Sequence, residues 1–461
     1  MSSQENLGKS DAQQPLIAGL LAVSTLLLVQ QSGWIWQSLY FQFYPVAELL
    51  IALALMLFVF NVCVVILRLF FGHAISYKVT NASIGLLFSF IMFNYLTKIG
   101  LFPAEPTTLL KALALAFGLV ASLFTLKINS NLWKRLHLAV IIGGGIFTFT
   151  PLLLANVLAP TVYWPSPSNQ PATQKAPKLP AQNNIVLLLD EFSADAAEPV
   201  VDQLKGAGLD VASFSIEPAG ENTINVIPAI WTRSNFDQSA PCGPTQLCSA
   251  GDVLDFSKVH ASSDNIDIVG FYHRYCSIQG LRSCTFAPLP KNNAITDLSC
   301  SFPGVGHLKF IGCSSAYEYK RSSFISLREN ILNNTFKAPF WQSGGVLFVH
   351  LLTPHPLMGI PLRPLNHEYN ENILHSADTV RLVAEKAKSA FRNNFRIIVF
   401  SDHPLRKEFW CSDKTYQKFG CKVESSNISR QVPLIIAAPS YEQFVHKSIK
   451  NNQNIFDILY Q

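Results

Sequence analysis

Hydrophobic residues along this chain of 461 residues are concentrated in the first third, where they form five long runs. Each run holds roughly the 20 apolar residues that cross a bilayer. The runs lie near residues 15–30, 46–70, 82–103, 107–126 and 137–158. This pattern predicts a helical bundle of five transmembrane spans over residues 1–159. The leader before the first run has Lys9 as its single basic residue, and four more runs follow, which disfavours a cleaved signal peptide.

The pattern changes after a proline-rich stretch. Residues 160–182 hold six prolines among small and polar residues, which is typical of an extended linker. Beyond it, short aliphatic runs of strand length alternate with stretches of helical periodicity, which predicts an α/β domain over residues 183–461 with a mostly parallel sheet covered on both faces. The expected strands are 185–189, 209–215, 266–271, 345–352, 396–401 and 432–438, and the expected helices include 191–206, 377–391 and one that begins at Thr223.

Composition and charge support a membrane protein. Hydrophobic residues make up 49% of the chain and charged residues only 14%, which is too apolar for an ordinary soluble protein of this length. The net charge of +5 is spread over loops, and the chain has no basic run and no glycine-rich phosphate loop, so a nucleic-acid partner is disfavoured. With the amino terminus inside, the cytoplasmic loops contain Arg68, Lys78, Lys127, Lys134 and Arg135. The positive-inside rule then predicts that the domain after residue 160 lies on the outer side.

The outer loop 31–45 has no charged residue and is rich in aromatic side chains. They are Trp34, Trp36, Tyr40, Phe41 and Phe43. Aromatic rings of this kind favour the lipid–water interface. The loop is therefore interpreted as an interfacial anchor, with a platform for a lipid substrate as the alternative.

Cysteine positions agree with an exported domain. One of the nine cysteines, Cys63, falls in the second apolar run, and the other eight all follow residue 240 in closely spaced twos. An even set of this kind predicts disulfides and an oxidising compartment. The expected bridges are 242–248, 276–284, 300–313 and 411–421. A zinc cluster is disfavoured because no C-x-x-C spacing occurs.

Candidate chemistry follows two of the predicted strands. Asp190 and Glu191 come directly after the run 185–189, and Asp402 and His403 come after the run at 396–401. Because neighbouring parallel strands end at the same edge of a sheet, these groups are expected to converge. Together with the hydroxyl of Thr223 they form a set suited to a hydrolase or transferase that uses a hard divalent metal. Acids after a strand can also serve only as helix caps, and so can a threonine at a helix start.

The order of these motifs resembles a known family. A strand followed by Glu, then Thr-x-x-x-x-Pro, Thr-Pro-His and Ser-Asp-His is similar to the membrane-anchored phosphoethanolamine transferases of the alkaline phosphatase (sulfatase-like) superfamily, whose relatives include phosphoglycerol transferases and lipoteichoic acid synthases. The resemblance implies that Glu191, Thr223, Asp402 and His403 bind the metal. It also implies that Thr223 is the nucleophile and that His355 contacts the phosphoryl group or the acceptor.

The resemblance further implies a cofactor, a reaction and a location. One divalent ion is expected, zinc first and manganese as the alternative, with Asp190 and His355 as substrate contacts. Apart from the resemblance, Arg406 or Lys407 is expected to supply positive charge to the substrate. The reaction would move phosphoethanolamine from a phospholipid donor to a cell-envelope glycan or lipid-linked sugar through a phospho-threonine, in a bacterial inner membrane with the C-terminal domain in the periplasm. Phosphoglycerol transfer is the alternative reaction.

The chain also departs from the family pattern. Phe192 and Pro404 stand where a small hydroxyl residue and glycine are usual, and no second histidine follows His403 within the next forty residues. A catalytically inactive scaffold in polysaccharide assembly is therefore a further alternative.

Overall fold

The computed structural model describes residues 183–232, 236, 239–249, 253–261, 265–287, 316–356, 363–412, 414–422, 430–440, 450–452 and 454–456, with short stretches before residue 136. The chain divides into two compact units. One comprises Met1–Trp36 and Tyr44–Ala159, and the other comprises Gln37–Phe43 and Pro160–Gln461. The linker 160–182 and most of the five predicted spans lie outside the described residues. Among the helices that are described, none is long and apolar enough to cross a membrane.

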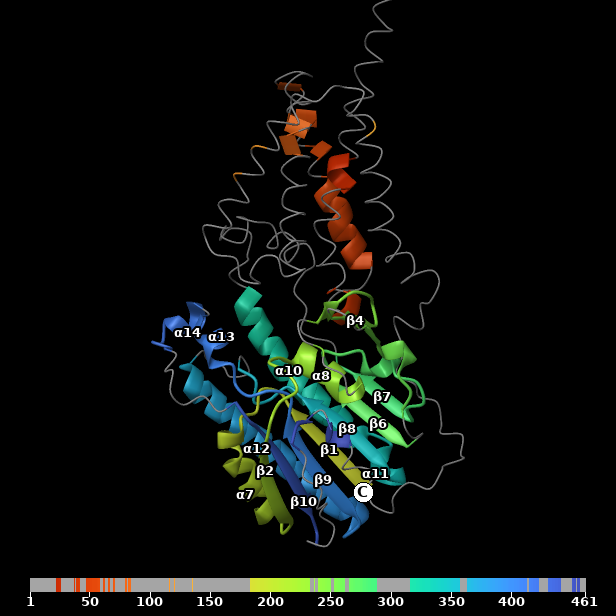
Figure 1. Ribbon diagram of the computed structural model, residues 1–461, viewed down its shortest axis with the longest axis vertical. Coiled ribbons are helices and arrows are strands. Elements are labelled where there is room, and N and C mark those ends of the chain that lie inside the picture. Colours follow the sequence, from red (N-terminus) through yellow and green to blue (C-terminus); the bar gives the residue numbers. More distant parts are fainter. Residues whose placement is uncertain are drawn as a thin grey trace, which may run out of the picture. The chain divides into compact units, whose positions relative to one another are not determined.

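The second unit is built around a seven-stranded sheet of order β2-β10-β9-β1-β8-β6-β7 (Figure 1). Neighbouring strands run parallel except β10, which is antiparallel to both β9 and β2. The prediction of an α/β domain with a mostly parallel sheet is confirmed. The strands are β1 (Asn183–Leu189), β2 (Asp210–Ile216), β6 (Ile266–Gly270), β7 (Ser283–Phe286), β8 (Val346–Leu351), β9 (Phe395–Ser401) and β10 (Val432–Ala438).

All six predicted strands are present, but two details of the sheet differ from the expectation. Strand β2, expected to be buried, lies at an edge and is largely exposed, with Phe214 49% accessible. Strand β7, at the opposite edge, was not predicted. A separate three-stranded sheet is formed by β3 (Ala240–Pro241), β4 (Gln246–Cys248) and β5 (Val253–Asp255).

The helices begin and end differently from the predicted ranges. The helix expected over 191–206 is a turn followed by α7 (Glu198–Gly206), because a proline in its first turn suits a helix start there. The helix expected over 377–391 is the end of the longer α12 (Leu365–Phe391), and α8 begins at Thr223 as predicted. Among the described residues from 183 on, the helices are α7, α8 (Thr223–Thr232), α10 (Ala316–Lys337), α11 (Phe340–Ser343), α12, α13 (Lys407–Ser412) and α14 (Lys414–Gln417), with short 3-10 turns at Ala194–Ala196, Phe256–Lys258 and Tyr275–Ser277.

Two hydrophobic clusters cover the two faces of the sheet, as the alternation of side chains along a strand requires. Alternate β1 residues, such as Leu187 and Leu188, belong to opposite clusters. The first cluster packs β1 against α7 and α12, and the second packs it against α8. The strand is therefore buried on both sides, which holds its carboxyl end in place.

Part of the aromatic loop 31–45 belongs to this second unit. Tyr40 and Phe41 are 0% and 5% exposed and are members of the second hydrophobic cluster. For these two residues the interpretation as an interfacial anchor is wrong, because a buried tyrosine can also place its ring in a protein core and its hydroxyl on an internal acceptor. Trp34, Trp36 and Phe43 lie outside the described residues.

Three of the four predicted disulfides are confirmed. The structure contains Cys242–Cys248, Cys276–Cys284 and Cys411–Cys421. The fourth predicted pair, Cys300 and Cys313, lies outside the described residues.

Candidate active site

The candidate site lies where β1 and β9 end side by side. Leu189 pairs with Ser401 in the parallel register, so the next residues, Asp190 and Asp402, meet at one edge of the sheet. The Glu191 backbone N–H donates a hydrogen bond to Asp402 Oδ1 over 3.1 Å, which joins the two strand ends directly. The convergence expected from parallel strands is therefore present, although more than 200 residues separate the two motifs.

The turn after β1 is held in an unusual backbone conformation. Glu191 has a φ of 59°, in the left-handed region that few non-glycine residues adopt. The Tyr369 hydroxyl donates to the Glu191 carbonyl over 2.8 Å, and the Phe192 N–H donates to Ser401 Oγ over 2.8 Å. These contacts fix the turn, in which the carboxylates of Asp190 and Glu191 have different partners.

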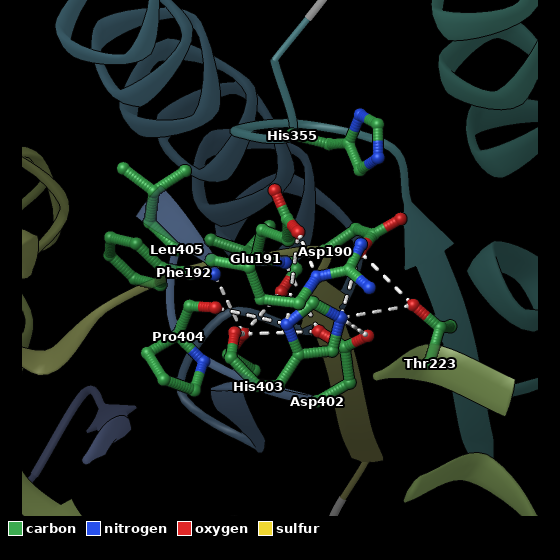
Figure 2. Close-up of polar contacts among 12 residues, drawn as sticks. Asp190, Glu191, Phe192, Thr223, His355, Asp402, His403, Pro404 and Leu405 are labelled. Atoms are coloured by element: carbon green, nitrogen blue, oxygen red, sulfur yellow. Dashed lines mark hydrogen bonds and ion pairs between the residues drawn. The ribbon is translucent and has the colours of Figure 1, made fainter. Parts of the chain in front are cut away.

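Asp190, Asp402 and His403 bring one ligand atom each to within 4.8 Å of one another, and all three are buried (Figure 2). His403 Nδ1 lies 3.0 Å from the Pro404 carbonyl, which can only accept, so Nδ1 carries the proton. The lone pair of Nε2 is then available 3.3 Å from Asp402 Oδ2 and 4.0 Å from Asp190 Oδ1. A histidine that donates its other ring N–H to a carbonyl is the usual arrangement of a metal ligand.

Thr223 places its hydroxyl against this cluster from the start of α8. Its Oγ1 donates to Asp190 Oδ1 over 3.3 Å and lies 3.3 Å from His403 Nε2. The helix contains Pro228, which has no N–H to offer the Ile224 carbonyl. Ser239 Oγ donates to that carbonyl over 2.6 Å, so the helix keeps its first turn. The positive end of the helix dipole favours negative charge beside Thr223.

Glu191 lies beside the cluster with its carboxylate engaged elsewhere. Arg406 Nε donates to Oε1 and Trp410 Nε1 donates to Oε2, each over 2.6 Å. His403 Nδ1 is 4.0 Å from Oε1, but that nitrogen already faces the Pro404 carbonyl. Asp190 thus belongs to the cluster with Asp402 and His403, and Glu191 lies next to it. Glu191 instead anchors Arg406 and Trp410, a role that the sequence did not indicate.

His355 and Arg406 lie around the cluster. His355 follows β8, and Figure 2 shows it apart from the cluster, with no polar contact drawn to it. Its Nδ1 donates to the Pro356 carbonyl over 2.7 Å, its ring meets Trp410 edge-on at 5.0 Å, and burial lowers its pKa. The Arg406 side chain is 30% exposed and its guanidinium lies 4.8 Å from the centre of the Phe409 ring. Arg406 is therefore a partly exposed positive charge beside the buried acids.

The electrostatics of the site fit a divalent cation. Burial, followed by the charges of Asp402 and Glu191, raises the pKa of Asp190 well above its ordinary value. Burial also opposes ionisation of Asp402, but His403 and hydrogen bonds outweigh it and hold the pKa of Asp402 below its ordinary value. Arg406 balances the charge of Glu191, which leaves two buried carboxylates to be neutralised. Asp402 Oδ2 accepts no hydrogen bond from any described residue, as expected of an oxygen reserved for a metal.

Two further residues lie behind the threonine. His273 Nε2 is 3.2 Å from the Thr223 carbonyl, and His273 Nδ1 is 2.9 Å from the Tyr40 hydroxyl. Burial holds the pKa of His273 well below its ordinary value and raises that of Tyr40, so both side chains are neutral near pH 7. No sequence motif marks either residue, and 233 positions separate them along the chain.

Comparison with known proteins found no matching family model and no matching curated protein. Solved structures are similar at low identity. The C-terminal periplasmic domain of phosphoethanolamine transferase EptC from Campylobacter jejuni is 11% identical and matches 61% of this chain and 89% of its own, with a TM-score of 0.34. The integral membrane protein lipooligosaccharide phosphoethanolamine transferase A (EptA) from Neisseria meningitidis is 12% identical and matches 96% and 95%, with a TM-score of 0.33. The lipoteichoic acid synthase LtaP from Listeria monocytogenes is 9% identical and matches 60% and 72%, with a TM-score of 0.33.

Proposed function

We propose that the protein is a metal-dependent transferase that moves a phospho-alcohol head group, phosphoethanolamine in the first instance, from a phospholipid to a cell-envelope glycan or lipid-linked sugar. The proposal includes an inner-membrane location with the C-terminal domain in the periplasm. One observation carries it. The Thr223 hydroxyl, at the start of a helix, lies 3.3 Å from both Asp190 and His403 in a buried cluster of acids and imidazole.

Asp190, Asp402 and His403, with Thr223 Oγ1 as the fourth group, would hold one divalent ion. Oxygen and nitrogen donors in this number suit zinc, and the share of oxygen also admits manganese. The bound ion would lower the pKa of the Thr223 hydroxyl and offset negative charge on the phosphoryl oxygens. Glu191, which the sequence resemblance also proposes as a ligand, would act next to the ion by holding Arg406.

Two transfers at Thr223 would complete the reaction. In the first, the hydroxyl hydrogen faces Asp190 Oδ1, and Thr223 Oγ1 forms a bond to the donor phosphorus while the bond from phosphorus to the diacylglycerol oxygen breaks. The diacylglycerol oxygen leaves with the proton that the Thr223 hydroxyl gives up. In the second, the acceptor oxygen forms a bond to phosphorus and gives its proton to His355 Nε2, the bond from phosphorus to Thr223 Oγ1 breaks, and Oγ1 takes up a proton in place of the one it lost.

Arg406 and His355, which lie around the cluster, would contact the donor and the acceptor. Arg406 uses its Nε on Glu191, so its other N–H groups, on a partly exposed side chain, can meet the donor phosphate. His355, whose Nδ1 donates to a backbone carbonyl, keeps the lone pair of Nε2 for the proton of the acceptor hydroxyl. Phosphoglycerol would be transferred by the same steps, and labelled donors of both kinds distinguish the two reactions. An inactive scaffold has no need for a hydroxyl held between an acid and an imidazole.

The experiment uses the full-length chain in detergent with phosphatidylethanolamine or phosphatidylglycerol as donor. Intact-protein mass spectrometry should show a head-group adduct that maps to Thr223 and disappears in Thr223→Ala. Thr232→Ala, at the other end of the same helix, is the matched control and should keep the adduct. An adduct that survives in Thr223→Ala, or metal-loaded protein that forms none with either donor, contradicts the proposal.

A further inference from the structure

A chain of hydrogen bonds reaches the proposed nucleophile from a distant part of the sequence. The Thr223 carbonyl can only accept, so His273 Nε2, at 3.2 Å, carries the proton and donates it. The neutral ring then has its lone pair on Nδ1, and the Tyr40 hydroxyl donates to it over 2.9 Å. The backbone N–H of Arg274 donates to the Tyr40 oxygen, which leaves the phenol hydrogen for His273. Each hydrogen bond of this chain therefore has a defined donor and a defined acceptor.

Packing around this hydrogen-bond chain excludes water and alternative partners. Tyr40 and His273 are both fully buried, and their rings meet edge-on at 6.1 Å. Phe256 contacts both rings, and Phe41 lies against Tyr272 at 4.4 Å between ring centres. Loss of the Tyr40 hydroxyl would thus leave His273 Nδ1 buried without its partner, and the ring would be free to change tautomer or orientation.

We propose that Tyr40 is a positioning residue for Thr223, acting through His273, and that the segment that carries Tyr40 and Phe41 is therefore part of the active site. This inference rests on the proposed function for the role of Thr223 as nucleophile. The segment is flanked on both sides by residues of the other unit, so the sequence of the first 159 residues supplies part of the catalytic apparatus.

The effect on the reaction follows from where His273 donates. The Thr223 carbonyl lies in the first turn of α8, so a displacement of that carbonyl also displaces Oγ1 relative to Asp190 and His403. A misplacement of about 1 Å at a reacting atom can cost roughly 100-fold in rate. Donor binding involves other groups. Three of the four proposed metal-binding groups, Asp190, Asp402 and His403, keep their positions, so the protein should retain its metal.

The test compares two substitutions that each remove one hydroxyl from a buried tyrosine–histidine pair. Tyr40→Phe should lower kcat for head-group transfer by roughly 10- to 100-fold, as for other partners that orient a site histidine, with KM for the donor and the metal content unchanged. Tyr275→Phe is the matched control. The Tyr275 hydroxyl lies 2.9 Å from His350 Nδ1, but His350 has no hydrogen bond to Thr223 among the described residues. The kcat of Tyr275→Phe should therefore stay near that of the wild type.

A second measurement does not depend on activity. In full-length protein labelled with ¹⁵N-histidine, the ring nitrogens of His273, assigned with His273→Gln, should report a neutral imidazole protonated at Nε2. Tyr40→Phe should shift the Nδ1 signal or mix the tautomers, whereas Tyr275→Phe should leave it unchanged. A wild-type His273 that is protonated at Nδ1, or a Tyr40→Phe spectrum identical to the wild type, overturns the inference.

The two measurements separate failure of this inference from failure of the proposed function. If the ¹⁵N signals respond as expected but neither the wild type nor Tyr40→Phe transfers a head group, the hydrogen-bond chain stands and the proposed reaction is wrong. If the wild type transfers the head group and Thr223→Ala does not, while Tyr40→Phe keeps full kcat, the reaction stands and the positioning role is wrong. Tyr40→Phe in a His273→Gln background should cause no further loss of kcat, because the hydrogen bonds of the His273 ring are already absent.

Discussion

At the scale of single residues, the two neighbouring acids after β1 have different partners. Asp190 faces Thr223 and His403, whereas both oxygens of Glu191 accept hydrogen bonds from Arg406 and Trp410. Loss of a residue that only hydrogen-bonds to a metal ligand costs roughly 10- to 100-fold in metal affinity. Asp190→Asn should lower the affinity for a divalent ion by more than this, because Asp190 is itself a proposed ligand. Glu191→Gln should keep a full equivalent of metal and raise KM for the donor, because Arg406 loses its charged partner.

Metal content of the two variants after dialysis against a weak chelator distinguishes these roles. Asp402→Asn provides the reference for loss of a ligand. The opposite result, in which Glu191→Gln loses metal and Asp190→Asn retains it, would return the ligand role to Glu191, as the sequence resemblance implies.

The ionisation of Asp190 predicts how metal binding depends on pH. In the metal-free folded protein the pKa of Asp190 is raised. The contribution of Asp190 to stability is therefore fully present below its pKa in the unfolded chain, about 4, and is lost as the pH rises through its pKa in the folded protein. A divalent ion removes that penalty. The gain in Tm on adding metal should therefore increase as the pH rises from about 4 through the folded pKa of Asp190.

The lowered pKa of Asp402 acts in the opposite direction and at lower pH. Its contribution to stability is present above the unfolded value of about 4 and is lost only as the pH falls through its folded pKa, which lies outside the tested range. Thermal unfolding with and without metal at several pH values measures the effect. Asp190→Asn should flatten the increase, and a wild-type gain that is constant over this range would contradict the assignment.

The sequence predicted the presence of these residues better than their roles. Asp190, Glu191, Asp402 and His403 were found because each pair follows an aliphatic run that ends at the edge of the sheet. Which acid faces the cluster depends on the left-handed turn at Glu191, and a non-glycine residue in that conformation leaves no mark in a single sequence. Tyr40 and His273 could not be paired, because only the folded chain brings them together.

At the scale of elements, a short disulfide-bonded segment holds one side of the site. Trp410 in α13 donates to Glu191, and the next residue, Cys411, is bonded to Cys421. Replacement of both cysteines by serine should loosen α13, weaken the hold of Trp410 and Arg406 on Glu191, and raise KM for the donor by roughly 10-fold, about 1.4 kcal/mol. Steady-state kinetics of the full-length chain measure this change.

The matched control for this prediction is a disulfide elsewhere in the same unit. Cys242–Cys248 joins the residue that follows β3 to the last residue of β4, in the separate three-stranded sheet. Replacement of both cysteines by serine should lower stability without raising KM. Equal KM values in the two double variants would show that the Cys411–Cys421 bridge has no specific role at the site.

Elements with strong apolar patterns were predicted well, and mixed ones were not. The strands β1, β8, β9 and β10 are buried along their length and were recognised from continuous aliphatic runs. The first half of α12 was missed because its buried face carries the polar residues Glu368 and Asn372 beside Leu365, Tyr369 and Ile373. Strand β7 has four residues, too few to show a period.

At the scale of the whole molecule, the sequence indicates two parts joined by a proline-rich linker, and the second unit contains a segment from the first part. Tyr40 and Phe41 are buried among residues that follow position 180. Neither composition nor periodicity predicts that this segment packs in the second unit, because an aromatic loop has the same pattern at a lipid interface and in a protein core. The five spans and the outward orientation stay predictions that labelling of both sides of the membrane can test.

The segment Gln37–Phe43 leads to a prediction about a fragment that begins at residue 160. This fragment would lack two buried aromatic side chains, each worth about 1.5–3 kcal/mol when fully buried, and would expose Tyr272 and His273. It should therefore unfold at a lower temperature than the same unit in the full-length chain. It should still bind one divalent ion, because all the proposed ligands follow residue 189.

Catalysis by the fragment is the more specific part of this prediction. With a short-chain, water-soluble donor, which removes the advantage of a membrane anchor, kcat of the fragment should match that of full-length Tyr40→Phe, because both lack the hydroxyl that orients His273. The comparison is made on metal-loaded protein, so that a difference in kcat does not reflect metal content. A fragment with the kcat and unfolding temperature of the intact wild-type protein would show that Gln37–Phe43 contributes nothing to the active site.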